Sequence, residues 1–308
     1  MRVLVTGATG FLGRHVVQGL VGRRQTVIAA VHAGKKPTQP LSGVRTVSLD
    51  LAAKKSIAAA FRLARPDAVI HCAAYGVNPA SEPDIDQAVR VNVLGTCDLI
   101  ASAAKAGIPR LLNVGSCFEY GEASRPVRES DVLRPMGVYG ITKAAASELA
   151  LEMGRRTGLP VAVARVFSLW GPGEPAHRFV PQILCACLRR ETVRLTPCAQ
   201  KRDYLHVEDA ASMLIDLCVS RRYPDGQILN VGSGRETRLS DFARRIARVL
   251  GGERFLGFGR LPYRDGEAMR LTADISKLRK WTRPTRESQT LFAARVRRMA
   301  HEMAVQSC

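Results

Sequence analysis

The chain has 308 residues, 46% of them hydrophobic, which is enough for a sizeable core in one large α/β domain or two interlocked ones. No apolar run reaches the ~18 residues of a membrane-spanning helix, so we expect no membrane partner. The formal net charge is +19, but the basic residues are spread along the chain and only 6% of residues are aromatic. This pattern disfavours nucleic acid as a partner and suits a basic cleft for anionic ligands.

The first stretch of the chain, MRVLVTGATGFLG, predicts a strand, a glycine-rich turn and a helix. The apolar strand covers residues 2–6, and the turn has the spacing G-x-x-G-x-x-G. Gly7 permits a tight turn, Gly10 lets the backbone approach a pyrophosphate, and Gly13 lets the helix pack close to the strand. The start of the helix offers free N–H groups to phosphate oxygens. We therefore expect a dinucleotide site here.

Strand and helix patterns alternate over the first two thirds of the chain, which predicts a Rossmann-type doubly wound parallel sheet with helices on both faces. The expected strands are 3–6, 26–31, 45–48, 68–71, 110–115 and 161–167. The expected helices are 13–21, 54–65, 83–106, 139–154, 178–189, 208–220, 239–250 and 288–304.

The pattern changes after Phe167, where the pieces become shorter and more polar, with strands expected near 192–195 and 228–231. We expect a dinucleotide-binding domain at 1–167 and a smaller, partly interleaved α/β substrate-binding part at 168–308. A later strand and helix near 204–232 would return to the first domain.

The eight cysteines (72, 97, 117, 185, 187, 198, 218 and 308) lack paired C-x-x-C spacing, so we expect core packing and no metal site. Reduced thiols fit a cytoplasmic protein. Because Met1 leads directly into the first strand, we expect no signal peptide.

Tyr139 and Lys143 form the pattern Y-x-x-x-K, which places both side chains on one face of a helix. A nearby ammonium favours the phenolate and lowers the phenol pKa from its ordinary ~10, so Tyr139 is a candidate acid/base. Ser116 ends a predicted strand at the edge where open α/β sheets bind ligands, and its hydroxyl can hold a substrate oxygen. Taken separately, the Tyr/Lys pair also fits an amphipathic surface, and Ser116 also fits a helix cap.

Together these pieces resemble the extended short-chain dehydrogenase/reductase family, in its nucleotide-sugar epimerase/dehydratase/reductase branch. The resemblance covers nearly the whole chain. The matching segments are TGATGFLG (6–13), DL (50–51), HCAA (71–74), VNVLGT (91–96), GSCFEYG (115–121), YGITK (139–143), RVFSLWGPG (165–173), KRDYLHVED (201–209) and LNVGSG (229–234).

The resemblance implies a catalytic set of Ser116, Tyr139, Lys143 and Asn92, with Tyr139 as the acid/base, Lys143 as its helper and ribose contact, and Asn92 as a support for the active-site backbone. Taken alone, an Asn inside a helix more simply bonds locally. The implied cofactor contacts are Gly7, Gly10, Phe11, Leu12, Gly13, Asp50, Leu51, Ala73, Ala74, Tyr139, Lys143 and Phe167. The implied substrate contacts are Ser168, Phe179, Arg202 and Arg264, of which Arg202 would grip a diphosphate.

The chain departs from the family pattern in two places beside the reaction centre. The 4,6-dehydratases carry acids where this chain has Cys117 and Phe118, so a dehydratase is disfavoured. Ser168 replaces an Asn that commonly contacts the substrate, so this position does not identify which sugar is recognised.

The end of the second predicted strand bears on the choice of cofactor. NAD sites place Asp or Glu there, about 20 residues after the glycine motif, for the ribose 2′-OH. Here the position is Val31, followed by His32 and Lys35, and the first carboxylate of the chain is Asp50. Arg14 could reach the same corner. These groups favour NADP(H) over NAD, although they also fit a solvated loop.

The expected function is NADP(H)-dependent reduction of a nucleotide-diphosphate-linked 4-keto(-6-deoxy) sugar to the 4-hydroxy sugar. The alternative enzyme is an NAD-dependent UDP-sugar 4-epimerase. An alternative of another class, a non-catalytic cofactor-sensing regulator, would not need the full Ser116, Tyr139 and Lys143 set. The resemblance also suggests a homodimer that packs helices 83–106 and 139–154 against a second copy.

Overall fold

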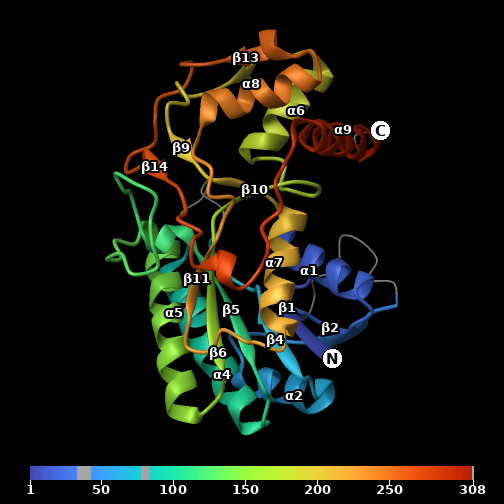
Figure 1. Ribbon diagram of the computed structural model, residues 1–308, viewed down its shortest axis with the longest axis vertical. Helices are drawn as coiled ribbons and strands as arrows, with labels where there is room; N and C mark the ends of the chain where they lie inside the picture. The colour runs from blue at the N-terminus through green and yellow to red at the C-terminus, as the bar shows by residue number, and fades with distance from the viewer. Residues whose placement is uncertain (33–42, 78–82, 307–308) are drawn as a thin grey trace.

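The computed structural model describes residues 1–32, 43–77 and 83–306, which form a central sheet with helices on both faces (Figure 1). Within these residues, seven strands form the main parallel sheet in the order β11-β6-β5-β4-β1-β2-β3. Their bounds are β1 Arg2–Thr6, β2 Thr26–Val31, β3 Arg45–Ser48, β4 Ala68–His71, β5 Leu111–Ser116, β6 Val161–Val166 and β11 Ile228–Val231. The strand order reverses beside β1, where such sheets bind ligands at their carboxyl edge. The predicted doubly wound sheet is confirmed.

The inner strands are apolar because both of their faces are covered. Every residue of β4, β5 and β6 is buried. Neighbouring residues of one strand enter opposite cores, as Val69 and Ile70 do. Continuous apolar runs, without polar alternation, are therefore the correct sequence signature for these strands.

Two layers of helices cover the sheet. One face carries α1 (Phe11–Gly22) and α7 (Val207–Val219), and the other carries α2 (Lys54–Ala64), α4 (Gly95–Lys105) and α5 (Gly137–Thr157). The two layers bury separate apolar clusters against the sheet, one through residues such as Leu20 and Leu214, the other through residues such as Ile57 and Leu99.

The single helix expected over residues 83–106 is wrong. The chain forms a short helix α3 (Ile85–Ala88), a π-helical stretch η1 (Val89–Leu94) and then α4. At the junction, a Cβ on Gly95 would lie 2.8 Å from the carbonyl oxygen of Leu51, so the helix passes the end of β3 at close range. The wider turns just before Gly95 place Asn92 in the interior, and a π-turn of this kind is often found at functional sites.

A second part of the molecule lies above the carboxyl edge of the main sheet in Figure 1. Its helices α6 (Phe179–Arg189), α8 (Leu239–Val249) and α9 (Gln289–Gln306) pack around Trp170, Phe242 and Phe292. Among the described residues, its strands form small sheets: β7 (Ser168–Trp170) with β10 (Tyr204–His206); β9 (Lys201–Arg202) between β12 (Thr237–Arg238) and β14 (Arg270–Leu271); and β8 (Val193–Arg194) with β13 (Leu256–Gly257). Short 3₁₀ turns occur at η2 (Cys117–Glu119), η3 (Glu253–Phe255) and η4 (Leu278–Lys280).

The chain leaves the main sheet after β6 and returns to it through α7 and β11. The expected division into domains at 1–167 and 168–308 remains a prediction. Within the described residues, no helix has the length and apolar character needed to cross a bilayer. The seven cysteines of that part of the chain are all free thiols, and Cys187 packs against the cluster around Trp170.

Candidate functional site

The glycine-rich turn between β1 and α1 forms one end of the candidate site. Gly7 has a φ of +64°, and a Cβ there would lie 2.7 Å from the backbone nitrogen of Ala73. A Cβ on Gly13 would overlap the carbonyl oxygen of Gly7, so both positions need glycine. Gly10 is the N-cap of α1, and within the described residues no side chain caps this helix and its first turn holds no acid. The N–H groups of Phe11 and its neighbours therefore remain for an anion, which fits a dinucleotide pyrophosphate.

The ends of β2 and β3 bring His32 and Asp50 together. Their Nε2 and Oδ1 atoms lie 3.7 Å apart, and the Asp50 carboxylate also accepts a hydrogen bond from the N–H of Ala52 at 2.9 Å. The end of β2, which carries no acid of its own, therefore has a carboxylate beside it, because adjacent parallel strands end at the same edge of the sheet and Asp50 follows β3. Leu51, the next residue, is buried. Lys35 lies outside the described residues.

Arg14 and His15, in the first turns of α1, contact the loop that follows β7. A guanidinium nitrogen of Arg14 donates to the carbonyl of Gly173, and His15 Nε2 lies 2.9 Å from the carbonyl oxygen of Pro172. The structure thus directs the Arg14 side chain to this loop, where a carbonyl attracts it. Its expected reach to the end of β2 stays a prediction.

Three further cofactor candidates lie at the ends of β4 and β6. Ala73 and Ala74 lie two and three residues beyond the end of β4, and the N–H of Ala73 donates to Thr6 Oγ1 at 3.3 Å. Phe167 follows β6 and is 3% exposed, with its ring stacked on Tyr120 at a centroid distance of 6.4 Å. The core therefore holds the Phe167 ring, and its contact with a cofactor stays a prediction.

Ser116 and Tyr139 meet where β5 ends and α5 begins. Ser116 is the last residue of β5, and its Oγ accepts a hydrogen bond from the N–H of Phe118 at 3.2 Å. Tyr139 lies in the first turn of α5, with its ring edge-on to that of Phe118 at 6.2 Å. Burial raises the pKa of the Tyr139 phenol above its ordinary value, and a hydrogen bond with the Ser116 side chain opposes this. The expected lowering of the Tyr139 pKa is therefore not the net effect in this arrangement.

Lys143 lies one helical turn beyond Tyr139 and is 2% exposed. Its Nζ donates to the carbonyl of Val114 at 2.7 Å, which anchors α5 to β5. Burial lowers the pKa of Lys143, whereas the carboxylate of Glu119 and the thiol of Cys72 raise it. The positive charge of this lysine thus depends on its buried neighbours.

Asn92, in the π-helical stretch, joins two elements that are distant in sequence. Its amide nitrogen donates to the carbonyl of Tyr75 and to Thr142 Oγ1, both at 3.0 Å, and its Oδ1 accepts from the N–H of Tyr75 at 2.8 Å. The simpler interpretation, in which the Asn92 side chain bonds within its own helix, is therefore wrong. It ties the segment after β4 to α5, the helix of Tyr139.

A chain of buried hydrogen bonds runs from β1 to the same stretch. His71 lies between Thr6 Oγ1, 2.6 Å from its Nδ1, and Thr96 Oγ1, 3.1 Å from its Nε2, and the Thr96 hydroxyl donates to the carbonyl of Asn92 at 2.7 Å. Burial and the charge of Lys143 lower the pKa of His71 to about 3, so its ring is neutral. A neutral ring suits this chain, because it accepts from Thr6 and donates to Thr96.

The two predicted substrate arginines, Arg202 and Arg264, lie in segments that Glu267 joins. Arg202, on β9, donates to the carbonyl of Lys201 at 3.1 Å and pairs with Glu267 at 3.6 Å. Arg264 begins the turn that carries Glu267, whose N–H donates to the Arg264 carbonyl at 3.2 Å. Burial raises the pKa of the Cys117 thiol to about 12, and the charge of Arg202 opposes this.

The remaining predicted substrate residues, Ser168 and Phe179, both lie beside Tyr204. Ser168 begins β7 beside Tyr204 of β10, and Phe179 begins α6 with its ring stacked on Tyr204 at 6.4 Å. In the preceding loop, Oε2 of Glu174 is buried without a hydrogen-bond partner among the described residues. Burial raises the pKa of Glu174 to about 8, and the nearby charge of Arg178 opposes this.

The sequence interpretation missed two fully buried acids next to the site. Glu119 accepts a hydrogen bond from the N–H of Ser116 at 2.7 Å and pairs with Arg165 at 2.6 Å. Asp203 accepts from the N–H groups of Ser233 and Gly234, at 2.7 and 2.9 Å, and so fixes the turn after β11. The available signal was a charged residue within an apolar segment: Arg165 within VAVARV, and Glu119 within GSCFEYG.

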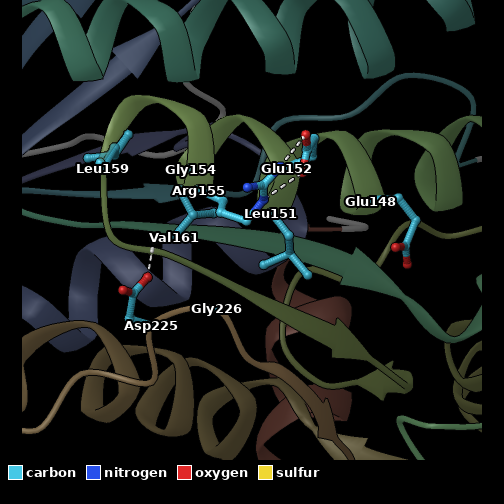
Figure 2. Close-up of a pocket in the computed structure, with 10 residues that line it drawn as sticks. Glu148, Leu151, Glu152, Gly154, Arg155, Leu159, Val161, Asp225 and Gly226 are labelled. Carbon is cyan, nitrogen blue, oxygen red and sulfur yellow. Dashed lines mark hydrogen bonds and ion pairs between the residues drawn. The ribbon is translucent and has the colours of Figure 1, made fainter.

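A cavity of about 470 Å³ lies at the opposite end of β6 (Figure 2). Its lining includes Glu152 and Arg155, which form an ion pair, and Asp225, which accepts from the N–H of Val161 at 3.0 Å. Val161 begins β6, whereas Val166, at its other end, pairs with Ser116, so this cavity is separate from the candidate site. Among the described residues, no group of three or more His, Cys, Asp or Glu side chains could hold a metal ion.

Comparison with known proteins gives relatives of several activities. The chain is 33% identical to a dTDP-6-deoxy-L-talose 4-dehydrogenase (NAD(P)(+)) of Kitasatospora kifunensis over 81% of this chain and 78% of that protein. It is 29% identical to a probable dTDP-glucose 4,6-dehydratase of Sinorhizobium fredii over 81% of this chain and 76% of that protein. Among solved structures, it resembles the UDP-glucose 4-epimerase of Thermus thermophilus in complex with NAD, with a TM-score of 0.85 and 27% identity over 98% of this chain and 99% of that one.

A family model matches most of the chain. The model described as the NAD dependent epimerase/dehydratase family matches residues 3–232, from the first strand to the turn after β11. The glycine turn, the Ser116 and Tyr139 pair and the buried Lys143 all lie within that span. The chain therefore belongs to the NAD-dependent epimerase/dehydratase family.

Proposed function

We propose that this protein is an NADP(H)-dependent reductase of a nucleotide-diphosphate-linked 4-keto(-6-deoxy) sugar. The observation that carries the proposal is a full acid/base set, Ser116, Tyr139 and Lys143, beside two residues unable to act as acids. Cys117 is a buried thiol with a pKa of about 12, and Phe118 is apolar, so the site lacks the acid that elimination of water needs at these positions. When a cofactor supplies the hydride, reduction of a ketone needs only two groups from the protein: a proton donor and a contact for the ketone oxygen.

A nicotinamide cofactor, when bound, would supply the hydride to C4 of the sugar. Tyr139 would donate its phenolic proton to the ketone oxygen. The Ser116 Oγ accepts from the N–H of Phe118, and its hydroxyl, which bonds Tyr139 in this structure, would turn its proton to the same ketone oxygen. The buried ammonium of Lys143 would favour the phenolate that remains after proton transfer and bond the cofactor ribose.

The cofactor would lie along the carboxyl edge of the main sheet. The first turn of α1, with Phe11 and Leu12, would take the pyrophosphate, as the uncapped helix start allows. Asp50 and Leu51 would contact the adenine. His32, with Lys35 in the segment that follows it, would receive a 2′-phosphate, which is why we favour NADP(H).

The substrate would lie across the surface formed by Arg202 and Arg264. A guanidinium matches the geometry of phosphate oxygens, and Arg202 is held 3.6 Å from Glu267, an ion pair that a diphosphate could replace. Phe179 and Ser168 would face the nucleoside and the sugar. The relative that is 33% identical is named as a 4-dehydrogenase of a dTDP-6-deoxy sugar, in agreement with this substrate class.

An NAD-dependent UDP-sugar 4-epimerase is the second candidate, and the position of Asp50 favours it. A carboxylate 3.7 Å from His32 reduces the positive charge at the rim and would repel a 2′-phosphate. The resembling Thermus thermophilus structure is an epimerase in complex with NAD. The same Ser116, Tyr139 and Lys143 would then act on a transient ketone.

Titration of the purified protein with NADPH and NADH separates the two candidates. We expect tighter binding of NADPH, followed by net oxidation of NADPH when a dTDP- or GDP-4-keto-6-deoxy sugar is added. The measurements are the fluorescence of the bound cofactor and the loss of its absorbance during turnover.

Three other outcomes of this titration would change the proposal. Equal or tighter binding of NADH without net oxidation, together with interconversion of UDP-glucose and UDP-galactose, would establish the epimerase. Cofactor binding without turnover of either substrate class would support the cofactor-sensing regulator. Equal affinity for both cofactors with net oxidation would keep the reductase and reject the NADP preference.

A further inference from the structure

We infer that Glu119 is a positioning residue of the proposed reaction: its buried carboxylate holds Ser116 at the end of β5 and keeps Lys143 positively charged. The inference rests on the proposed roles of Ser116 and Lys143 as catalytic groups. Glu119 itself is 0% exposed, so it touches neither cofactor nor substrate and acts through its neighbours.

The contacts of Glu119 define its position completely. Oε1 accepts from the N–H of Ser116 at 2.7 Å and from the Ser147 hydroxyl at 3.0 Å, and Oε2 accepts from Nε of Arg165 at 2.6 Å. A Cβ at Gly115 would lie 2.6 Å from Oε1, so the space for the carboxylate exists because residue 115 is glycine. The partners of Glu119 lie on β5, α5 and β6, so its carboxylate joins three of the elements that surround the site.

The contact with Ser116 is half of a capping box. The Ser116 Oγ accepts from the N–H of Phe118, while Glu119 accepts from the N–H of Ser116. Together the two bonds fix the backbone and the hydroxyl of Ser116 at the start of η2. The direction in which the hydroxyl proton points toward a substrate oxygen therefore depends on Glu119.

Glu119 and Lys143 meet the same two elements. Lys143 Nζ donates to the carbonyl of Val114, two residues before the Ser116 N–H that Glu119 accepts, and Ser147, one helical turn beyond Lys143, donates to the Glu119 carboxylate. Burial lowers the pKa of Lys143, and Glu119 provides the largest opposing effect. The other titratable groups that face this lysine are neutral near pH 7, because burial raises the pKa of Cys72 to about 12 and lowers that of His71 to about 3. The phenol of Tyr139 is neutral as well, since burial raises its pKa. Glu119 is thus the carboxylate that balances the ammonium.

Glu119 in turn depends on Arg165. Burial raises the pKa of Glu119, while the charges of Arg165 and Lys143 and the N–H of Ser116 lower it. Arg165 is 1% exposed, lies over the Tyr120 ring at 4.7 Å and reaches Glu148 on α5 at 3.3 Å. The direct ion pair with Arg165 favours the anionic form, which the role toward Lys143 requires.

The test compares Glu119→Gln with Glu148→Gln, which removes the same charge from another partner of Arg165 that contacts neither Ser116 nor Lys143 in the described structure. The Lys143 side chain is followed by NMR of protein with isotope-labelled lysine, and a Lys143→Arg variant assigns its signal. In Glu119→Gln we expect Lys143 to lose its proton at a lower pH than in the wild type. We expect Glu148→Gln to leave the Lys143 titration unchanged.

Kinetics with the 4-keto sugar nucleotide give a second readout. In Glu119→Gln we expect kcat to fall on the order of 10- to 100-fold, the cost of misplacing a reacting group, with KM and cofactor affinity nearly unchanged. The alkaline limb of the kcat profile should move to lower pH. Glu119→Asp keeps the charge but shortens the side chain, so it should restore the Lys143 titration while kcat stays low. Because Glu119→Asp keeps a carboxylate to pair with Arg165, it can be measured in place of Glu119→Gln if that variant fails to fold.

An unchanged Lys143 titration and kcat in Glu119→Gln, with only a lower unfolding temperature, would overturn the inference, because Glu119 would then have a structural role alone. An equal shift in Glu148→Gln would overturn it too. The NMR titration needs no substrate. If the wild type turned over no keto sugar, the proposed function would fail while the effect of Glu119 on Lys143 was still measured.

Discussion

Tyr139 experiences two opposing influences in the described structure. Burial raises the pKa of its phenol, and the hydrogen bond with Ser116 lowers it. The ammonium of Lys143 is turned to the carbonyl of Val114. The site therefore holds Tyr139 as a neutral proton donor at physiological pH, which is the form that reduction of a ketone requires.

Removing this proton donor tests its role directly. Tyr139→Phe keeps the edge-on contact with Phe118 and removes the hydroxyl. General acid catalysis typically contributes ~10²–10⁴-fold, so we expect a fall in kcat of that order, measured in stopped or continuous assays of NADPH oxidation. Affinity for the cofactor should change little. Turnover close to that of the wild type would show that another group supplies the proton.

At the scale of single residues, the sequence predicted what is local and missed what depends on distant contacts. Ser116 and Tyr139 meet as expected, because a strand end and a four-residue helical spacing can be recognised in the chain. The ion pair of Glu119 with Arg165 joins residues 46 positions apart, and no local spacing marks it. The contact of His32 with Asp50 escaped for the same reason, since it depends on the order of β2 and β3.

At the scale of elements, the π-helical stretch η1 is held in place by one amide. Asn92 supplies three hydrogen bonds to Tyr75 and Thr142, and it is 2% exposed. A regular α-helix over the same residues would turn this side chain by a different angle. The irregular helix at η1 thus allows Asn92 to link the segment after β4 to α5.

Substitution of this amide should affect both stability and activity. Asn92→Ala leaves the backbone N–H and carbonyl of Tyr75 without their partner, and a buried unsatisfied group costs about 1–3 kcal/mol. We expect the free energy of unfolding in urea to fall by about that amount, with a lower kcat because α5 carries Tyr139. As a control, Thr142→Ser keeps the hydroxyl that Asn92 contacts, and both quantities should stay near those of the wild type. Unchanged stability in Asn92→Ala would mean that water replaces the amide.

Apart from α4, whose start at Gly95 was missed, the long elements were predictable from sequence to within a few residues, and most of the short ones were not. The core strands are continuous apolar runs, and helices such as α2 and α8 show clear amphipathic spacing. The strand expected near 192–195 is present as β8, but β9, β12, β13 and β14 have two residues each, too few to show any alternation. The sequence of η1 also does not indicate a π-helix, because its composition suits an α-helix.

At the scale of the whole molecule, exposed apolar side chains gather on the helices that were expected to form a dimer. Ile85 is 62% exposed, Leu94 50% and Ile141 54%, with Val89 and Leu149 at 39% each. They lie on α3, η1 and α5, on the face of the sheet away from α1 and α7. A second copy of the chain would cover them, and we propose a homodimer through this face.

Sedimentation of the purified protein tests the dimer. We expect the wild type to sediment as a dimer and Leu149→Lys to sediment as a monomer, because a charge would be buried at the interface. Leu188→Lys is the matched control: Leu188 is 43% exposed, on α6 in the other part of the molecule, and its replacement should leave the dimer intact. A monomeric wild type, or equal effects of both changes, would reject this interface.

The late return of the chain to the main sheet limits how the protein can be recombined with its relatives. Because β11 pairs with β6 although 61 residues separate the end of one from the start of the other, a single crossover after β6 would supply an edge strand and its helix α7 from the second parent. The Arg14 and His15 contacts to the loop after β7 would then also join residues of different origin. Exchange of the second part between family members on both sides of α7 and β11 therefore calls for three junctions, one after β6, one before α7 and one after β11, so that the sheet keeps the sequence with which its core was packed.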